Sequence, residues 1–108
     1  MLVIKALTNI HEDWGESFED FCIYYQLDVG LEGVEGASDM FSFEVISPAR
    51  LNNVIEDIEI GRGYLIMKDY DQNKVEQTVK RIVEMSREED LDDALKNLSK
   101  YFRWDMDN

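Results

Sequence analysis

Two segments of alternating residues, joined by a short glycine-containing connection, constrain the fold of this chain more than any other feature. Between residues 21 and 31 the apolar side chains occupy every second position, namely Phe21, Ile23, Tyr25, Leu27 and Val29. Residues 39–47 repeat this alternation with Phe41, Phe43 and Val45. A period of two predicts strands with one buried face each. Gly33 and Gly36 suit a hairpin connection, so an antiparallel pair is expected.

The only proline of the chain marks the end of the second strand. Pro48 has no N–H group for a sheet ladder, but its fixed φ fits the first position of a helix. Ser47, immediately before it, is a good N-cap because its hydroxyl can accept a hydrogen bond from the first helical turn. The sequence therefore predicts a short helix directly after the strand, with an apolar stripe of Leu51, Val54 and Ile55.

Two amphipathic helices are expected in the last third of the chain. Asp71 is suited to cap the first, whose apolar residues are Val75, Val79, Ile82 and Val83. Asp90 is suited to cap the second, whose core-facing residues are expected to be Leu91, Ala94, Leu95, Leu98 and Tyr101. The tail, residues 102–108, is expected either to add a short strand or to pack Trp104 against the sheet.

Shorter signals complete the order of elements. Residues 2–8 and 64–68 predict further strands, whereas the acidic residues 9–20 predict a loop or a short irregular helix. This order predicts an α+β fold, with an antiparallel β-sheet of about four to five strands and helices packed on one face. A length of 108 residues suits one domain spanning residues 1–108.

Two observations bear on the cellular location. No apolar run in the sequence approaches the roughly 18 residues needed to cross a bilayer, so no membrane partner is expected. The single cysteine, Cys22, cannot form an internal disulfide. A lone cysteine agrees with a reducing compartment, so the protein is expected to be cytoplasmic.

The charge of the chain is strongly acidic and unevenly distributed. Eleven basic residues against 24 acidic ones give a net charge of −13. Residues 1–60 contain 13 acidic and two basic residues, whereas residues 61–108 contain 11 acidic and nine basic residues. Such a field repels nucleic acid and attracts basic partners. A basic protein partner is one interpretation of this charge, and solubility alone is the other.

Few groups have the spacing that catalysis or metal binding requires. Residues 69–80 begin like a calcium loop, but Lys74 and Lys80 replace the glycine and the glutamate of such a loop. One histidine and one cysteine, His11 and Cys22, are too few for a structural zinc site. We therefore expect no metal and no cofactor.

An enzyme is the weaker interpretation, although two arrangements stay open. His11 and Cys22 could form a nucleophilic pair, but the alternation gives Cys22 the place of a small packing residue. A pair of catalytic carboxylates is conceivable among the 24 acidic residues, but no pair stands out. No catalytic residue is therefore assigned.

Acidic residues gather around two aromatic side chains in residues 11–20. Glu12, Asp13, Glu16, Glu19 and Asp20 lie beside Trp14 and Phe18 in the sequence. Exposed aromatic residues surrounded by acids are typical of a protein-binding hot spot. In the alternative interpretation Trp14 closes the end of the sheet and the acids are simply solvated.

Four segments, taken in order, resemble the immunity protein 8 family of bacterial polymorphic toxin systems. Residues 41–51 have alternating aromatics, a Ser-Pro step and a leucine three positions after the proline. Residues 21–33 resemble the preceding strand of that family with its glycine-containing turn. Residues 61–71 resemble a Gly-Tyr-Leu-Ile strand that leads into a long helix, and residues 98–108 resemble a closing tryptophan-acid signature. The similarity covers nearly the whole chain.

This resemblance implies a protein that binds and neutralises a toxin domain encoded beside it, often a nuclease. A nuclease must present a basic surface to its anionic substrate, and an acidic partner could cover that surface. The expected partner is a cognate, basic toxin domain, with no nucleic acid, no membrane and no assigned oligomeric state. The alternatives are a small acidic interaction module of another pathway or a small enzyme.

The residues expected to contact the toxin lie in two acidic segments, because immunity surfaces usually lie on variable loops. They are Glu12, Asp13, Trp14, Glu16, Glu19 and Asp20 in the first segment, and Glu32, Glu35 and Asp39 in the second. By contrast, Phe43, Pro48, Leu65 and Trp104 are expected to determine the fold.

Overall fold

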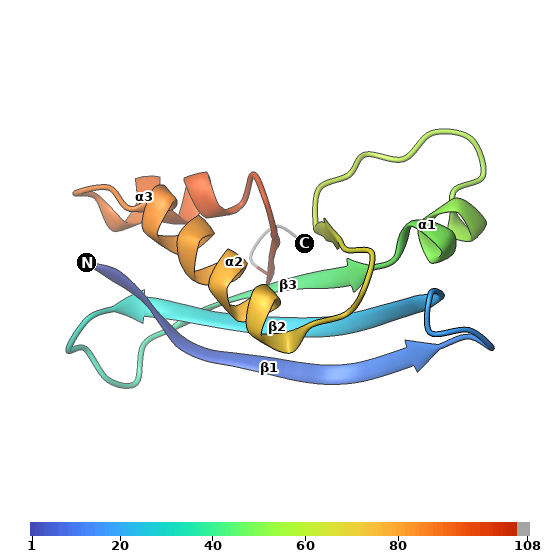
Figure 1. The fold of residues 1–108 in the computed structure, drawn as a ribbon. Coiled ribbons are helices and arrows are strands. Elements are labelled where there is room, and N and C mark those ends of the chain that lie inside the picture. The colour runs from blue at the N-terminus through green and yellow to red at the C-terminus, as the bar shows by residue number, and fades with distance from the viewer. Residues whose placement is uncertain (106–108) are drawn as a thin grey trace.

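A long antiparallel hairpin and a third strand form the centre of the fold (Figure 1). The computed structural model describes residues 1–105. Strand β1 (Leu2–Trp14) pairs with β2 (Phe21–Leu31), and β2 pairs with β3 (Asp39–Ile46), both antiparallel. The predicted hairpin between β2 and β3 is confirmed, and the glycines of its turn, Gly33 and Gly36, have φ values of 78° and 79°.

The outer edge of β3 is shared by two short strands. Strand β4 (Tyr64–Ile66) pairs parallel to residues 44–46, and β5 (Arg103–Trp104) pairs antiparallel to residues 41–42. The five-stranded sheet is therefore mixed, and the α+β class is confirmed. The parallel pair arises because the chain leaves β3 through a helix and a loop before it returns, which is the connection that parallel strands require.

The predicted helix caps are all present. Ser47 caps α1 (Pro48–Val54), Asp71 caps α2 (Gln72–Ser86), and Asp90 caps α3 (Leu91–Leu98). Each cap has extended backbone, and its side-chain oxygen accepts hydrogen bonds from N–H groups of the first turn. Capping accounts for Asp71, one of the residues that made residues 69–80 look like a calcium loop.

Helices α2 and α3 cover one face of the sheet and enclose the core between them and the strands (Figure 1). The alternating residues from Phe21 to Val29 in β2 and from Phe41 to Val45 in β3 are buried there, as predicted. From the helices come Val75, Val79, Ile82, Val83, Ala94, Leu95 and Leu98. Tyr101 was expected in this core, but it is exposed and Phe102 is buried instead. The helical spacing no longer applies there because α3 ends at Leu98.

Strand β1 extends six residues further than predicted. The loop expected at residues 9–20 is wrong for residues 9–14, which continue the strand, and only residues 15–20 form the turn. These six residues are exposed, so they lack the apolar alternation that would reveal a strand. Pairing with the first half of β2 determines their conformation, and two register shifts, next to Lys5 and Ile10, keep the long strands paired.

The short helix α1 lies at the end of the sheet rather than over the core. It has no buried residue, and the expected apolar stripe of Leu51, Val54 and Ile55 is only partly covered. Val54 and Cys22 both line a small hollow. Cys22 lies on the face of the sheet that points away from α2 and α3. This placement lets α1 close the end of the face that the other two helices leave open.

The tail prediction is confirmed within the described residues, while residues 106–108 of that tail lie outside them. Strand β5 is formed, and the ring of Trp104 stacks on Phe41 with 5.8 Å between ring centroids. Strand β4 is two residues shorter than expected, although the N–H of Met67 still donates to the carbonyl of Ile46 at 3.0 Å.

A partly buried tyrosine pair is expected to make the protein sensitive to alkaline pH. The hydroxyls of Tyr25 and Tyr70 are hydrogen-bonded to each other. Burial, followed by this hydrogen bond, raises the pKa of Tyr25 above its ordinary value of 10.0. Because the folded state favours the neutral phenol, this contribution to stability is complete below pH 10 and is lost as the pH rises above it.

The expected result is a steep fall in unfolding free energy of the wild type above pH 10. The variant Tyr25→Phe should be about 1 kcal/mol less stable than the wild type at pH 8. Between pH 10 and 11.5, however, its free energy of unfolding should fall less than that of the wild type. Urea titrations across this range measure both effects. Tyr101→Phe, at an exposed tyrosine, is the control and should keep the wild-type profile; equal slopes in all three proteins would contradict the assignment.

Candidate interaction surface

The sheet face opposite α2 and α3 is open to solvent along most of its length. The register places Tyr24, Gln26 and Asp28 of β2 on this face, together with Ser42 and Glu44 of β3. Tyr24 is exposed, and the other four side chains are half-buried. The open face is therefore polar and aromatic, in contrast to the apolar face that forms the core.

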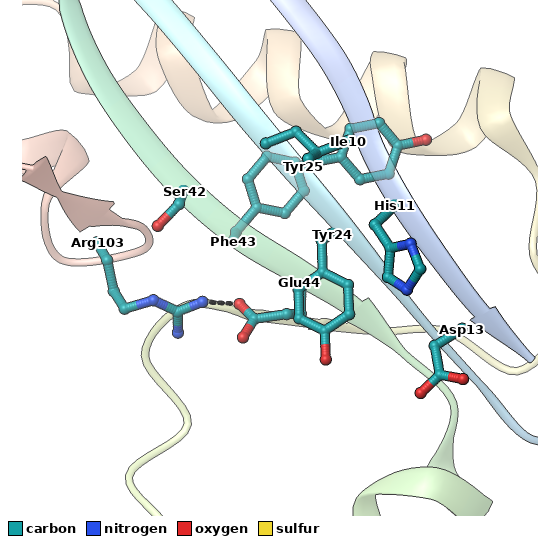
Figure 2. Close-up of a pocket in the computed structure, with 9 residues that line it drawn as sticks. All are labelled: Ile10, His11, Asp13, Tyr24, Tyr25, Ser42, Phe43, Glu44 and Arg103. Atoms are coloured by element: carbon teal, nitrogen blue, oxygen red, sulfur yellow. Dashed lines mark ion pairs between the residues drawn. The ribbon is translucent and has the colours of Figure 1, made fainter.

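A shallow groove of about 530 Å³ crosses this open face (Figure 2). Glu44 and Arg103 form an ion pair at one side of the groove, and the ring of His11 lies 5.8 Å from the ring of Tyr24 at the other. Figure 2 shows these side chains on one side of the strands, with α2 behind them. The groove thus offers an aromatic wall and a carboxylate that is already neutralised by an arginine.

The environment of Cys22 and Tyr24, on the open face, favours the neutral form of both groups. Burial raises the pKa of the Cys22 thiol, and a hydrogen bond between Cys22 and Tyr24 raises the pKa of the Tyr24 hydroxyl. A reactive cysteine needs the opposite shift. In the register, Cys22 lies opposite Asp13, whereas His11 lies opposite Tyr24. Cys22 is buried and, as the alternation suggested, has the character of a packing residue.

The turn between β1 and β2 is fastened to α1 by a single arginine. Arg50 contacts Asp13 at 2.8 Å and Asp20 at 2.5 Å, so one guanidinium joins the end of β1, the end of the turn and the helix. The hydrogen bond to Asp20, opposed by partial burial and reinforced by Asp13, raises the pKa of Arg50. Asp13 and Asp20 therefore have a structural partner within the chain, and their charge is partly balanced there.

Trp14 combines both roles that the sequence left open. Its ring packs against Phe21 at 5.0 Å and against Tyr70 at 6.1 Å, which closes the end of the core. Its indole N–H donates to Glu12 at 2.9 Å, and 38% of the residue stays exposed. The neighbouring Phe18 is 88% exposed. Glu16 and Glu19 flank Phe18 with exposed side chains, so this turn presents an aromatic ring between acids.

The second acidic segment lies at the opposite end of the sheet. Glu32 and Glu35 are exposed in the turn between β2 and β3, and Asp39 is half-buried at the start of β3. The eleven residues of β2 separate the two turns, which corresponds to roughly 35 Å of strand. The structure therefore does not bring the nine predicted residues together, and they form two separate acidic ends.

Sequence reasoning missed a third exposed segment, the loop of residues 55–63 between α1 and β4. Ile58 and Ile60 are 84% and 80% exposed, and Glu56, Asp57 and Glu59 beside them are exposed as well. A signal was present, since two isoleucines stand among acidic residues and, although Ile58 keeps the helical spacing of Leu51, Val54 and Ile55, Ile60 does not. Isoleucine is usually buried, so two exposed side chains so close together mark a surface of interest.

Residues 1–105 hold neither a cluster of metal ligands nor a helix suited to crossing a bilayer. Among residues 1–105, His, Cys, Asp and Glu side chains nowhere gather in a group of three that could hold a metal ion. Across the same range, every helix falls short of the length and apolar character that crossing a bilayer requires.

These features describe a small acidic α+β protein that presents carboxylates and apolar side chains on exposed turns and loops. The chain belongs to the Immunity protein 8 family, whose family model matches residues 3–108. It is therefore an immunity protein, and its partner is a toxin. The resemblance seen in the sequence motifs is thereby confirmed. Neither the search of curated proteins nor the search of solved structures found a match.

Proposed function

We propose that this immunity protein neutralises a nuclease toxin by covering its basic substrate-binding surface. The observation that supports this most is the charge of −13, combined with membership in the immunity family. Many of the acids are displayed to solvent, among them Glu16, Glu19, Glu32 and Glu35. A toxin that cleaves RNA or DNA carries cationic side chains where the phosphate backbone binds. An acidic protein competes for these side chains directly.

The mechanism needs no bond-making step by the immunity protein. Its negative field accelerates the encounter with a cationic toxin, and carboxylates then pair with arginine or lysine side chains. Once bound, the protein occupies the space through which the nucleic acid backbone would enter. Inhibition is therefore steric and electrostatic, and it takes place in the cytoplasm, where the reduced thiol of Cys22 agrees with the compartment.

The turn between β1 and β2 is the part of the predicted surface that best fits this role. It displays Glu16, Phe18 and Glu19 to solvent, and Glu12 and Trp14 adjoin it. Asp13 and Asp20 support it from within through Arg50. The turn at residues 32–38 lies at the other end of β2. It is therefore a separate candidate contact, which a toxin bound to the first turn does not need to reach.

The first experiment is co-expression with the toxin domain encoded beside this protein, scored by cell survival and co-purification. The double variant Glu16→Lys, Glu19→Lys is expected to lower the association rate by about tenfold at low salt. Stopped-flow or surface-plasmon measurements at two salt concentrations record this rate.

The matched control is Glu32→Lys, Glu35→Lys, which makes the same change of net charge at the opposite end. A rate that falls equally in both variants would show that net charge alone matters. A rate that falls only in the control would move the interface to the turn between β2 and β3.

A further inference from the structure

Three large apolar side chains protrude from one end of the molecule. Phe18 projects from the turn between β1 and β2, and Ile58 and Ile60 project from the loop of residues 55–63. Each is at least 80% exposed, so none of them contributes to the core. The ring of Phe18 makes an edge contact with Trp14, at 6.2 Å between ring centroids, but all three side chains stay largely exposed, whereas an interface would bury them.

The ends of the loop are fixed while its middle projects. At one end the N–H of Ile55 donates to Leu51 at 3.1 Å; at the other, the N–H of Gly63 donates to Tyr101 at 2.8 Å. The carbonyl of Gly63 in turn accepts from the N–H of Glu44 at 2.8 Å. Figure 1 shows the intervening segment arching away from the sheet above α1. The isoleucines are therefore displayed on a loop whose two anchors belong to the fold.

Helix α1 places the turn and the loop at the same end of the molecule. The turn is joined to α1 by the contacts of Arg50 with Asp13 and Asp20, and the loop begins directly at the last turn of α1. In Figure 1 the turn and the loop lie on either side of this helix. Phe18 and the two isoleucines can thus meet the same partner.

The charges around these side chains select the kind of partner. Phe18 is flanked by Glu16 and Glu19, and the isoleucines are flanked by Glu56, Asp57 and Glu59, all of them exposed. A second copy of this chain would bring an equal charge of −13 against the same end and would be repelled. A cationic surface with apolar recesses satisfies both the acids and the protruding side chains.

We propose that the turn and the loop form one two-part docking surface for the toxin, with Phe18, Ile58 and Ile60 as its apolar anchors. This inference rests on the proposed toxin-binding function and specifies the surface that carries it. The anchors insert into apolar recesses of the toxin, and the surrounding carboxylates pair with the basic side chains at their rim. The loop, which lies far from both acidic ends in the sequence, thereby becomes part of the interface.

The test uses the full-length protein and the neighbouring toxin domain carrying an inactivating substitution. The double variant Ile58→Ser, Ile60→Ser is expected to weaken the dissociation constant by at least about 100-fold in calorimetric titration. Phe18→Ala is expected to weaken it by about tenfold or more. The melting temperatures of these variants should stay close to that of the wild type, because the replaced side chains are exposed.

The matched control is Met85→Ser, which removes an exposed apolar side chain of α2, away from the turn and the loop. It should bind within about threefold of the wild type. If the wild type binds and the isoleucine variant binds equally well, the loop is not an anchor and the inference is wrong, while toxin binding itself stands. If the wild type neither binds the toxin nor protects cells from it, the proposed function and this inference fail together.

Discussion

Replacing Phe43 with alanine is expected to lower the free energy of unfolding by about 3–5 kcal/mol. The ring of Phe43 is buried on β3 between two others, with centroid distances of 5.2 Å to Tyr25 and 4.5 Å to Phe102. Truncation removes both contacts and leaves a cavity where the sheet meets the C-terminal segment. A domain of this size is stable by only about 5–15 kcal/mol, so the variant loses a large share of its stability.

Urea denaturation followed by circular dichroism measures this loss, and the melting temperature should fall by roughly 15–30 °C. Phe18→Ala is the matched control, because the same chemical change is made at an exposed ring. Its unfolding free energy should stay within about 1 kcal/mol of the wild type, because it loses one edge contact with Trp14. If Phe43→Ala melted within a few degrees of the wild type, the core described here would be incorrect.

Replacing Ser47 with alanine is expected to cost about 2–4 kcal/mol, an unusual amount for the loss of one hydroxyl. The buried oxygen of Ser47 accepts two hydrogen bonds of 3.1 Å, one from the N–H of Arg50 and one from the N–H of Phe21. The first bond caps α1. The second joins the end of β3 to the start of β2, and its loss leaves a buried N–H without a partner.

The same denaturation measurement tests this prediction. Ser38→Ala is the control, since Ser38 is exposed in the turn between β2 and β3 and its replacement should change stability by less than about 0.5 kcal/mol. A cost below about 1 kcal/mol for Ser47→Ala would mean that the bond to Phe21 contributes little. Capping alone would then account for the residue.

The elements with local signals were predicted correctly from the sequence. The alternation of β2 and β3 reports a face that is buried along most of each strand, and the caps Ser47, Asp71 and Asp90 act within their own first turns. The period of α2 and the first seven residues of β1 were recognised for the same reason. Each of these signals is contained within a few residues of chain.

The elements that failed depend on contacts between distant segments. Residues 9–14 are a strand because β2 extends beside them, and Tyr101 is exposed because α3 ends early and Phe102 occupies the core position. The parallel pairing of β4 likewise depends on the path of the connection. None of these outcomes is encoded in the local pattern of the residues concerned.

The candidate interaction surface was likewise predictable from local sequence only in part. Exposed acids at residues 16 and 19 followed from composition, but Arg50 lies 37 and 30 residues from its partners Asp13 and Asp20. The separation of the two acidic turns follows from the length of β2 and the order of strands. The exposure of Ile58 and Ile60 required the structure, because apolar residues in a sequence are first assigned to the core.

The contacts of Arg50 have a consequence for recognition. Because one guanidinium holds the strand end, the turn and α1 in fixed relation, the turn that carries Phe18 is ordered before any partner arrives. Binding of a partner then costs little backbone entropy, which favours slow dissociation of the complex. On the docking surface proposed above, such a preformed turn would discriminate between related toxins by shape, and a toxin with an altered surface would escape recognition.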